Sequence, residues 1–358
     1  MASNVRSRDL EIETIRGLAL FLMVAGHVIG YTSTRGMEVA DDSALRYLYD
    51  SLIDVRMPLF TAISGFVYAL RPVGKATSLS HFYSGKVRRI IVPLFVVSTL
   101  FFISQMLVPG TNNSRSWSEL PGIYFSGYAH FWFLQAVFCI FILVSLLEKM
   151  GWLDSPKALL AALAIATGTS LYSDAFPGFF SLSSAVRLLP SFLLGMALCR
   201  FPKQYITPSS LAAISALLIT VVLIDQAELL AAISLDEMET TAVGTLLGLA
   251  AIYLLIARRF FFAPLAWLGY YSFEIYLFHV FGTAGTRIAL NRLSIDSQWL
   301  MFVASMLVGM TLPVLLKKMV ERYGRLNLML FGTFSKKKRT AADLDIDAAK
   351  PPIERPLG

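Results

Sequence analysis

Apolar residues occur along this chain in long uninterrupted runs that are separated by short polar segments. A run of about 20 apolar residues is long enough to cross a lipid bilayer as a helix. The residues within the runs do not alternate between apolar and polar, as the strands of a membrane β-barrel do. The pattern predicts an all-α protein, a polytopic membrane helix bundle of about ten transmembrane helices. We place them near 14–33, 52–70, 89–108, 129–147, 157–173, 183–199, 207–225, 241–257, 264–285 and 299–318.

The composition and the distribution of charge agree with a membrane protein. Hydrophobic residues make up 56% of the 358 positions and charged residues only 15%, which is more apolar surface than a soluble domain needs. The net charge of +7 would suit a nucleic-acid partner, but it follows the predicted topology instead. With the N-terminus in the cytoplasm, 24 of the 31 Lys and Arg residues fall in inner segments, as the positive-inside rule requires. We therefore expect both termini to be cytoplasmic and no nucleic acid to be bound.

The chain divides into one membrane domain, residues 9–330, and a short cytoplasmic tail, residues 331–358. The tail begins with basic residues and continues as a polar segment, which is too short to bury a core and is expected to be disordered. Cys139 and Cys199 fall in or beside apolar runs, so no extracellular disulfide framework is expected. The first run has no small-residue cleavage site, and we interpret it as a retained helix rather than a signal peptide.

The first apolar run contains an arginine and a histidine, Arg16 and His27. Eleven residues correspond to roughly three helical turns and a rise of about 16 Å, so the two side chains lie on nearly the same helix face. Ionisable groups in a membrane helix usually face the bundle interior and often mark a reaction or a transport path. The alternative is structural: Arg16 as an anchor at the membrane surface and His27 as a partner in helix–helix hydrogen bonds.

A group of basic residues, called the basic cluster below, follows the second run on the predicted inner side. It consists of Arg71, Lys75, Lys86, Arg88 and Arg89. Guanidinium groups bind phosphate through two parallel hydrogen bonds and ammonium groups bind it as point charges, so the cluster is a candidate phosphate site. Such a loop also holds the orientation of the helices, and that role alone would explain it.

Several polar and aromatic residues gather at the predicted outer side. His130 and Trp132 open the fourth run from outside, and Glu274, Tyr276 and His279 lie in the second half of the ninth. By topology, three of the four histidines therefore lie at one depth in the membrane. Trp132 alone would equally suit the aromatic belt at the membrane surface.

Arg56 precedes the segment Met57–Pro58–Leu59–Phe60 at the outer start of the second run. It could pair with Asp54 or Asp50, or help to bind a substrate. The Ser64–Gly65 pair further along the run favours close helix packing. The sequence contains no Walker loop, dinucleotide fingerprint, metal-spaced His/Cys set or nucleophile elbow. Histidine is then the best available general base, because its ordinary pKa near 6.5 allows it to accept a proton at neutral pH.

Five motifs in this order resemble those of acyltransferase family 3, the integral-membrane O-acyltransferases that modify surface polysaccharides and related glycans. They are Arg16 with His27, MPLFTAISGF at 57–66, KVRRIIVP at 86–93, HFWFL at 130–134 and LGYYSFEIYLFH at 268–279. The resemblance covers residues 9–330 and is to the stand-alone form of the family.

The resemblance implies a function and roles for the residues. An acyl group, usually acetyl, passes from cytoplasmic acyl-CoA to a sugar hydroxyl of an extracytoplasmic or lipid-linked glycan, in a bacterial inner membrane. His27 and Arg16 match the family's essential pair, and Lys86 and Arg89 match a basic motif that often has two arginines. Arg56 stands where sugar O-acetylase relatives often have histidine. No tightly bound cofactor and no metal are expected, with acetyl-CoA as the donor substrate.

These observations combine into a hypothesis. The basic cluster holds the CoA phosphates, His27 deprotonates the acceptor or briefly carries the acyl group, and Arg16 holds the cofactor or orients the pathway. The acceptor end is lined by His130, Trp132, Glu274, Tyr276, His279 and Arg56. A transporter or flippase of a glycan or small anion is the alternative, because it would also use intramembrane Arg, His and Glu residues. A non-catalytic membrane subunit would leave Arg16 and His27 unexplained.

Overall fold

The computed structural model describes residues 9–74, 78–112 and 116–334. The tail expected to be disordered lies outside the described residues from position 335 onwards. The described residues form α-helices joined by loops and short helical turns, with no β-strand among them; one isolated bridge joins Ser126 to Phe179. The predicted all-α class is therefore confirmed.

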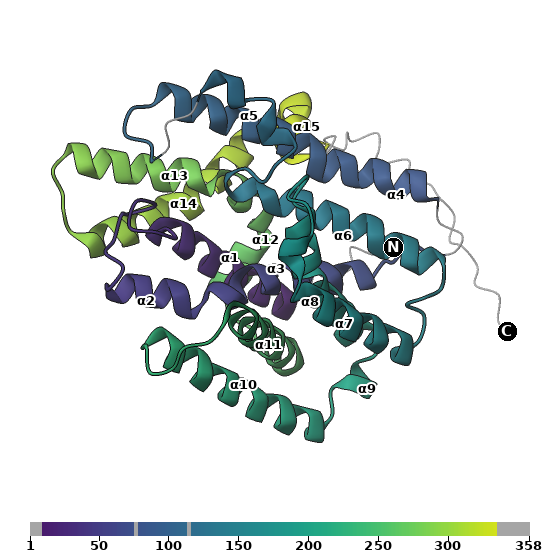
Figure 1. Cartoon of the computed structure of the whole chain (residues 1–358). Helices are drawn as coiled ribbons and strands as arrows, with labels where there is room; N and C mark the ends of the chain where they lie inside the picture. The colour runs from purple at the N-terminus through teal and green to yellow at the C-terminus, as the bar shows by residue number, and fades with distance from the viewer. Residues whose placement is uncertain (1–8, 75–77, 113–115, 335–358) are drawn as a thin grey trace, which may run out of the picture.

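The α-helices follow one another along the whole described chain. Figure 1 shows α1 and α3 in the middle of the bundle, with α4, α5 and α15 along one edge and α10 along the opposite edge. The helices are α1 (Leu10–Ile29), α2 (Ala44–Ser51), α3 (Ile53–Ala69), α4 (Leu79–Lys86), α5 (Val92–Leu107), α6 (Trp132–Lys149), α7 (Pro156–Ser170), α8 (Leu182–Arg200), α9 (Pro202–Tyr205), α10 (Pro208–Leu229), α11 (Glu237–Arg258), α12 (Ala263–Tyr270), α13 (Ser272–Arg292), α14 (Gln298–Val320) and α15 (Gly324–Phe331).

Helix α1 is the central element, and most of its residues are buried. It begins at Asp9, whose carboxylate accepts hydrogen bonds from the backbone N–H groups of Glu11 and Ile12, a standard N-terminal cap. It ends at Gly30, which has φ +88°. A Cβ at this position would lie 2.2 Å from the carbonyl oxygen of Arg35, so the tight turn after α1 requires glycine.

Glycines allow the central helices to pack backbone against backbone. A Cβ on Gly65 of α3 would lie 2.0 Å from the Phe192 carbonyl oxygen of α8, and one on Gly195 of α8 would lie 1.9 Å from the Ala62 carbonyl oxygen of α3. Small residues at such crossings let membrane helices approach closely. The close packing predicted for the Ser64–Gly65 segment is confirmed, and it fixes α3 against α8.

Seven helical segments among the described residues are long and apolar enough to cross a membrane, or eight if α2 and α3, which meet at a 41° bend, form one span. The predicted number of ten is not confirmed. Helix α7 has 15 residues, fewer than the roughly 20 that a span needs. The run predicted at 264–285 is divided at Tyr271 into α12 and α13. The cytoplasmic location of the termini stays a prediction.

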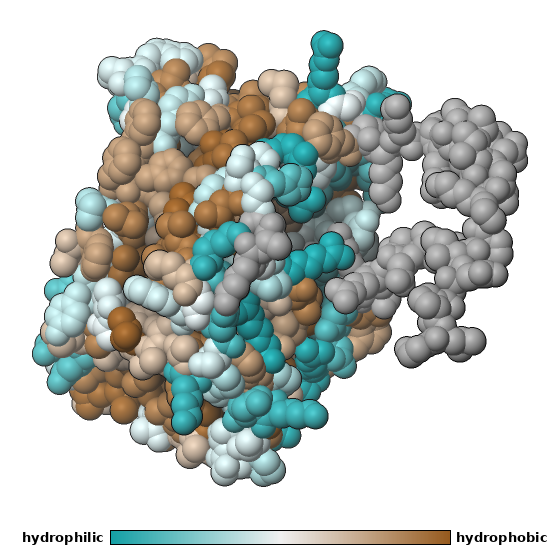
Figure 2. Space-filling view, turned by 90° about the vertical axis from the view of Figure 1, so that its right-hand side faces the viewer, coloured by the Kyte–Doolittle hydropathy of each residue, from teal (hydrophilic) through white to brown (hydrophobic). Residues whose placement is uncertain are grey.

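The surface carries broad apolar areas, as a bundle surrounded by lipid requires. Helix α10 has a single buried residue, Val221, and apolar side chains such as Ile219 and Leu223 are exposed on its outer face. Figure 2 shows another face of the molecule, on which hydrophilic side chains gather near the centre and apolar ones cover much of the upper and left-hand parts.

Candidate active site

A cavity of about 870 Å³ lies at the end of the bundle where α1 ends and α3 begins. Its walls come from the second half of α1, the starts of α3 and α8, the ends of α5 and α13, and the loop before α6. Because His27 and His130 both line it, we call it the histidine cavity. Its volume is within the range typical of small-molecule sites.

Three imidazole rings meet at the inner wall of the histidine cavity. The His279 ring centroid lies 4.9 Å from that of His27 and 4.9 Å from that of His130, and the His27 and His130 centroids are 6.0 Å apart. His27 is exposed to the cavity, whereas His130 is buried and His279 is completely buried behind the wall. The structure thus brings together the three histidines that the predicted topology places at one depth.

Each of the three rings has one nitrogen within hydrogen-bond distance of a main-chain carbonyl. His27 Nδ1 lies 2.9 Å from the Met23 oxygen, His279 Nδ1 lies 2.9 Å from the Tyr276 oxygen, and His130 Nε2 lies 3.3 Å from the Leu277 oxygen. A carbonyl oxygen only accepts, so these nitrogens donate. In the neutral His27 ring, Nε2 therefore carries the lone pair and can accept a proton.

The three rings do not form a metal site. No group of three or more His, Cys, Asp or Glu side chains in the described part of the chain is arranged to hold a metal ion. The rings instead contact one another edge to face, with interplanar angles between 66° and 78°.

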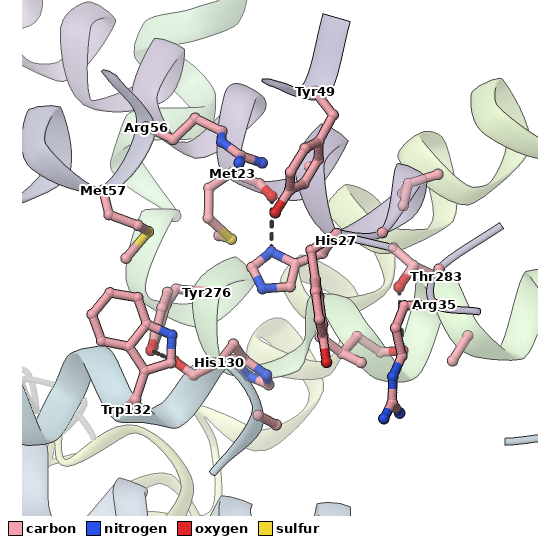
Figure 3. Close-up of a pocket in the computed structure, with 18 of the residues that line it drawn as sticks. Met23, His27, Arg35, Tyr49, Arg56, Met57, His130, Trp132, Tyr276 and Thr283 are labelled. Carbon is pink, nitrogen blue, oxygen red and sulfur yellow. Dashed lines mark hydrogen bonds between the residues drawn. The ribbon is translucent and has the colours of Figure 1, made fainter. Parts of the chain in front are cut away.

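Aromatic residues fix the wall beside the histidines. The Tyr276 hydroxyl donates a hydrogen bond to the His130 carbonyl oxygen, which ties α13 to the turn before α6. Trp132 begins α6 and lines the cavity together with Tyr276. Figure 3 shows the His27 ring in the middle of this group, with Arg56 and Tyr49 on one side and His130 and Trp132 on the other.

Arg56 reaches the cavity through a notch in α1. Its guanidinium carbon lies 4.1 Å from the centre of the Tyr49 ring, within the range of a cation–π contact. A Cβ on Gly26 would lie 1.5 Å from Arg56 Nη1, so the absence of a side chain at Gly26 makes room for the guanidinium. The side chain that was predicted to bind an acceptor therefore lies against the residue that precedes His27.

Arg16 does not line the cavity. Its Nη1 lies 2.8 Å from both carboxylate oxygens of Glu13, near the beginning of α1. Leu20 and Met23 follow it on the same helix face, and both are fully buried. Arg16 and His27 share a helix and a face as predicted, but apolar side chains separate them.

The basic cluster lies at the other end of α5 from the histidine cavity. Lys75 lies outside the described residues, and none of the other four residues lines the cavity. Lys86 Nζ lies 3.2 Å from the centre of the Phe141 ring, and the Arg88 guanidinium carbon lies 4.6 Å from that of Phe334. Arg71 and Arg89 are exposed. About 18 Å of helix separates Arg89 from the cavity residue Phe101, at 1.5 Å a residue.

Glu274 lies away from the position predicted for it. Because the helix is interrupted at Tyr271, Glu274 falls in the first turn of α13 rather than in the second half of a longer span. It does not line the cavity. Its carboxylate lies 3.7 Å from Lys317 Nζ of α14, so the structure places it beside the predicted inner end of that helix.

Sequence reasoning missed three arginines of the cavity wall. Arg35, Arg187 and Arg287 all line the histidine cavity, but the sequence assigned them only to outer segments. The sequence did contain a signal for these arginines. The positive-inside rule leaves outer segments poor in cations, so an arginine at the outer end of a helix indicates a role other than orienting the helices.

Comparison with protein-family models identifies the family. The family model described as an acyltransferase domain, that of acyltransferase family 3, matches residues 9–318. The chain belongs to acyltransferase family 3. The matched region of this family member contains the whole histidine cavity, the basic cluster and the Arg16–Glu13 pair.

A curated relative matches part of the chain. Nodulation protein NolL of Mesorhizobium japonicum is 25% identical to this acyltransferase-family chain over 168 residues. The match spans 45% of this chain and 43% of that protein. No solved structure is significantly similar to the chain.

Proposed function

We propose that this protein is a membrane-embedded O-acyltransferase. It moves an acyl group, acetyl in the simplest case, from cytoplasmic acyl-CoA to a sugar hydroxyl of an extracytoplasmic or lipid-linked glycan in a bacterial inner membrane. The observation that carries the proposal is His27: it is exposed to a large cavity, and its Nδ1 is occupied by the Met23 carbonyl. Family membership supports the acyl-transfer chemistry.

His27 acts as the general base in this proposal. Its Nε2 accepts the proton of the sugar hydroxyl as the hydroxyl oxygen attacks the thioester carbonyl carbon. The C–S bond then breaks, and the CoA thiolate takes the proton back from His27, so that the products are the sugar ester and free CoA. The Met23 carbonyl holds the ring in place and stabilises its protonated form.

The donor approaches from the basic cluster. Arg71, Lys86, Arg88 and Arg89 hold the CoA phosphates by charge, and Arg16 orients the path along α1. In the structure the buried side chains Leu20, Leu94 and Val97 fill the bundle between this cluster and the cavity. These side chains must move apart before the thioester can reach His27.

The acceptor occupies the histidine cavity. His130, Trp132, Tyr276 and Arg56 line it, and His279 supports the His27 ring from behind. Glu274 takes no part in acceptor binding here, because it lies beside Lys317 outside the cavity.

The test is release of CoA from acetyl-CoA by the purified protein in detergent, with extracted cell-surface glycans as acceptor. A general base typically contributes a factor of about 10² to 10⁴, so His27→Ala should lower the rate at saturating acetyl-CoA by at least about 10²-fold. His81→Ala is the matched control, because His81 is exposed on α4 and does not line the cavity.

Two results would overturn the proposal. One is a His27→Ala protein that retains the rate of the His81→Ala protein. The other is a folded wild-type protein that moves glycan across vesicle membranes without consuming acetyl-CoA, as a transporter would.

A further inference from the structure

The wall of the histidine cavity has more positive than negative charge. Four arginines line it, and the single carboxylate among its lining residues is that of Asp54. The arginines are Arg35, Arg56, Arg187 and Arg287. Charged groups removed from bulk water are costly unless an opposite charge or several hydrogen bonds compensate them, so the buried arginines Arg56 and Arg287 need partners.

Two of the four arginines have partners in the loops around the cavity. Arg287 Nη2 donates to the Gly110 carbonyl oxygen at 2.8 Å, and its Nη1 lies 3.7 Å from Glu38. Arg35 Nη1 donates to the Asn112 carbonyl oxygen at 2.7 Å. These arginines hold the loop after α1, the loop after α5 and α13 together.

Of the other two arginines, only Arg187 forms an ion pair with the cavity carboxylate. Arg187 Nη2 lies 3.7 Å from Asp54 Oδ1, and 60% of its side chain is exposed. Arg56 is 8% exposed and has no carboxylate within 4.0 Å in the described part of the chain. Asp54 itself is fixed against Gly244 of α11, where a Cβ would lie 2.5 Å from Oδ2. Among the side chains that line this part of the cavity, two guanidinium groups therefore stand beside a single carboxylate.

We infer that the acceptor is an anionic saccharide, and that Arg187 and Arg56 bind its carboxylate or phosphate group. This inference rests on the proposed function and extends it to the substrate class. Guanidinium groups bind both anions through two parallel hydrogen bonds. A carboxylate or phosphate group of the saccharide would supply the two guanidinium groups with negative charge in addition to that of Asp54.

The geometry also limits where the anionic group lies on the sugar. Arg56 rests against Gly26, and the next residue is His27. Arg56 and His27 also line the same cavity, so we expect an anion held by Arg56 to lie close to the base. The acylated hydroxyl belongs to the charged sugar itself or to its immediate neighbour.

A binding measurement tests this without relying on turnover. The probes are methyl glucoside, methyl glucuronide and methyl glucoside 6-phosphate, which share a ring and differ in the group at C6. Heat stability of the full-length protein in detergent is followed as each probe is titrated. The wild type should be stabilised by one or both anionic probes at concentrations at least about tenfold below those that methyl glucoside requires. The carboxylate and phosphate arms show which anion is preferred.

Variants connect this preference to the two arginines. Arg187→Gln and Arg56→Gln should each weaken binding of the preferred anionic probe about tenfold, as expected for loss of a charge-assisted hydrogen bond, and leave methyl glucoside unchanged. Arg292→Gln is the control: it removes a positive charge from the exposed end of α13 without touching the cavity, and it should bind all three probes as the wild type does.

Several outcomes overturn the inference. Equal stabilisation by charged and neutral probes is one, and an Arg187→Gln protein that behaves like Arg292→Gln is another. The cavity would be assigned to the donor if CoA stabilised the wild type, Arg187→Gln abolished that stabilisation, and the anionic sugars did not stabilise the protein. Absence of CoA release alongside tight binding of the anionic sugars would instead count against the proposed function, and would leave standing only the binding of an anionic saccharide by Arg187 and Arg56.

Discussion

At the scale of single residues, the site depends on how α1 and α3 fit together. The sequence predicts that His27, His130 and His279 share a depth, because span direction and position along the span fix depth. It does not predict that Gly26 makes room for Arg56, because the distance between two helix faces is set by tertiary packing. For the same reason the sequence does not predict the ion pair of Arg187 with Asp54, because the two residues lie on different helices that meet only in the folded protein.

Gly26→Ala tests whether the notch in α1 positions Arg56. The added methyl group would lie 1.5 Å from Arg56 Nη1, so the guanidinium must move away from the cavity wall. Because the displaced atom is at the end of a flexible side chain, we expect little change in heat stability and a several-fold rise in the KM for the glycan acceptor.

The control for this variant is Gly285→Ala. Gly285 also lines the cavity, but a Cβ there would meet no atom within 4 Å. A Gly26→Ala protein with the same acceptor KM as Gly285→Ala would show that the notch does not position Arg56.

At the scale of helices, long apolar runs are enough to predict the class of the fold but not every break in it. Apolar residues continue on both sides of Tyr271, so hydropathy gives no sign that the helix is interrupted between α12 and α13. That break explains why Glu274 lies beside Lys317 rather than in the cavity. The crossing of α3 and α8 could be anticipated, because Gly65 marks a position where two backbones can meet.

Gly195→Ala tests that crossing. The new Cβ would lie 1.9 Å from the Ala62 carbonyl oxygen, and neither backbone can yield without separating the helices. Overpacking of this kind typically costs about 1–3 kcal/mol, so the variant should unfold at a clearly lower temperature in detergent.

Gly168→Ala in α7 is the matched substitution. A Cβ at Gly168 meets no atom within 4 Å, and replacing a helical glycine by alanine typically stabilises by about 0.5–1 kcal/mol. If the two variants unfolded at the same temperature, the close packing of α3 on α8 would be refuted.

At the scale of the whole molecule, the two candidate substrate sites lie at opposite ends of α5. The basic cluster is at one end, the histidine cavity is at the other, and buried apolar side chains fill the region between them. The charge pattern of the sequence predicts this separation, because it places the cluster inside and the histidines toward the outside. The closed path between them depends on side-chain packing, which the pattern does not reveal.

The most direct test of the account is the sidedness of acyl transfer in sealed membrane vesicles that contain the protein. Acetyl-CoA does not cross a bilayer, so inside-out vesicles given labelled acetyl-CoA externally should label glycan in their lumen. Right-side-out vesicles should label glycan on their outer surface, and only when acetyl-CoA is sealed inside them. Vesicles of either orientation that contain the His27→Ala protein should label no glycan. Equal labelling of right-side-out vesicles by external acetyl-CoA, or labelling that persists in His27→Ala, would contradict transfer across the bundle at His27.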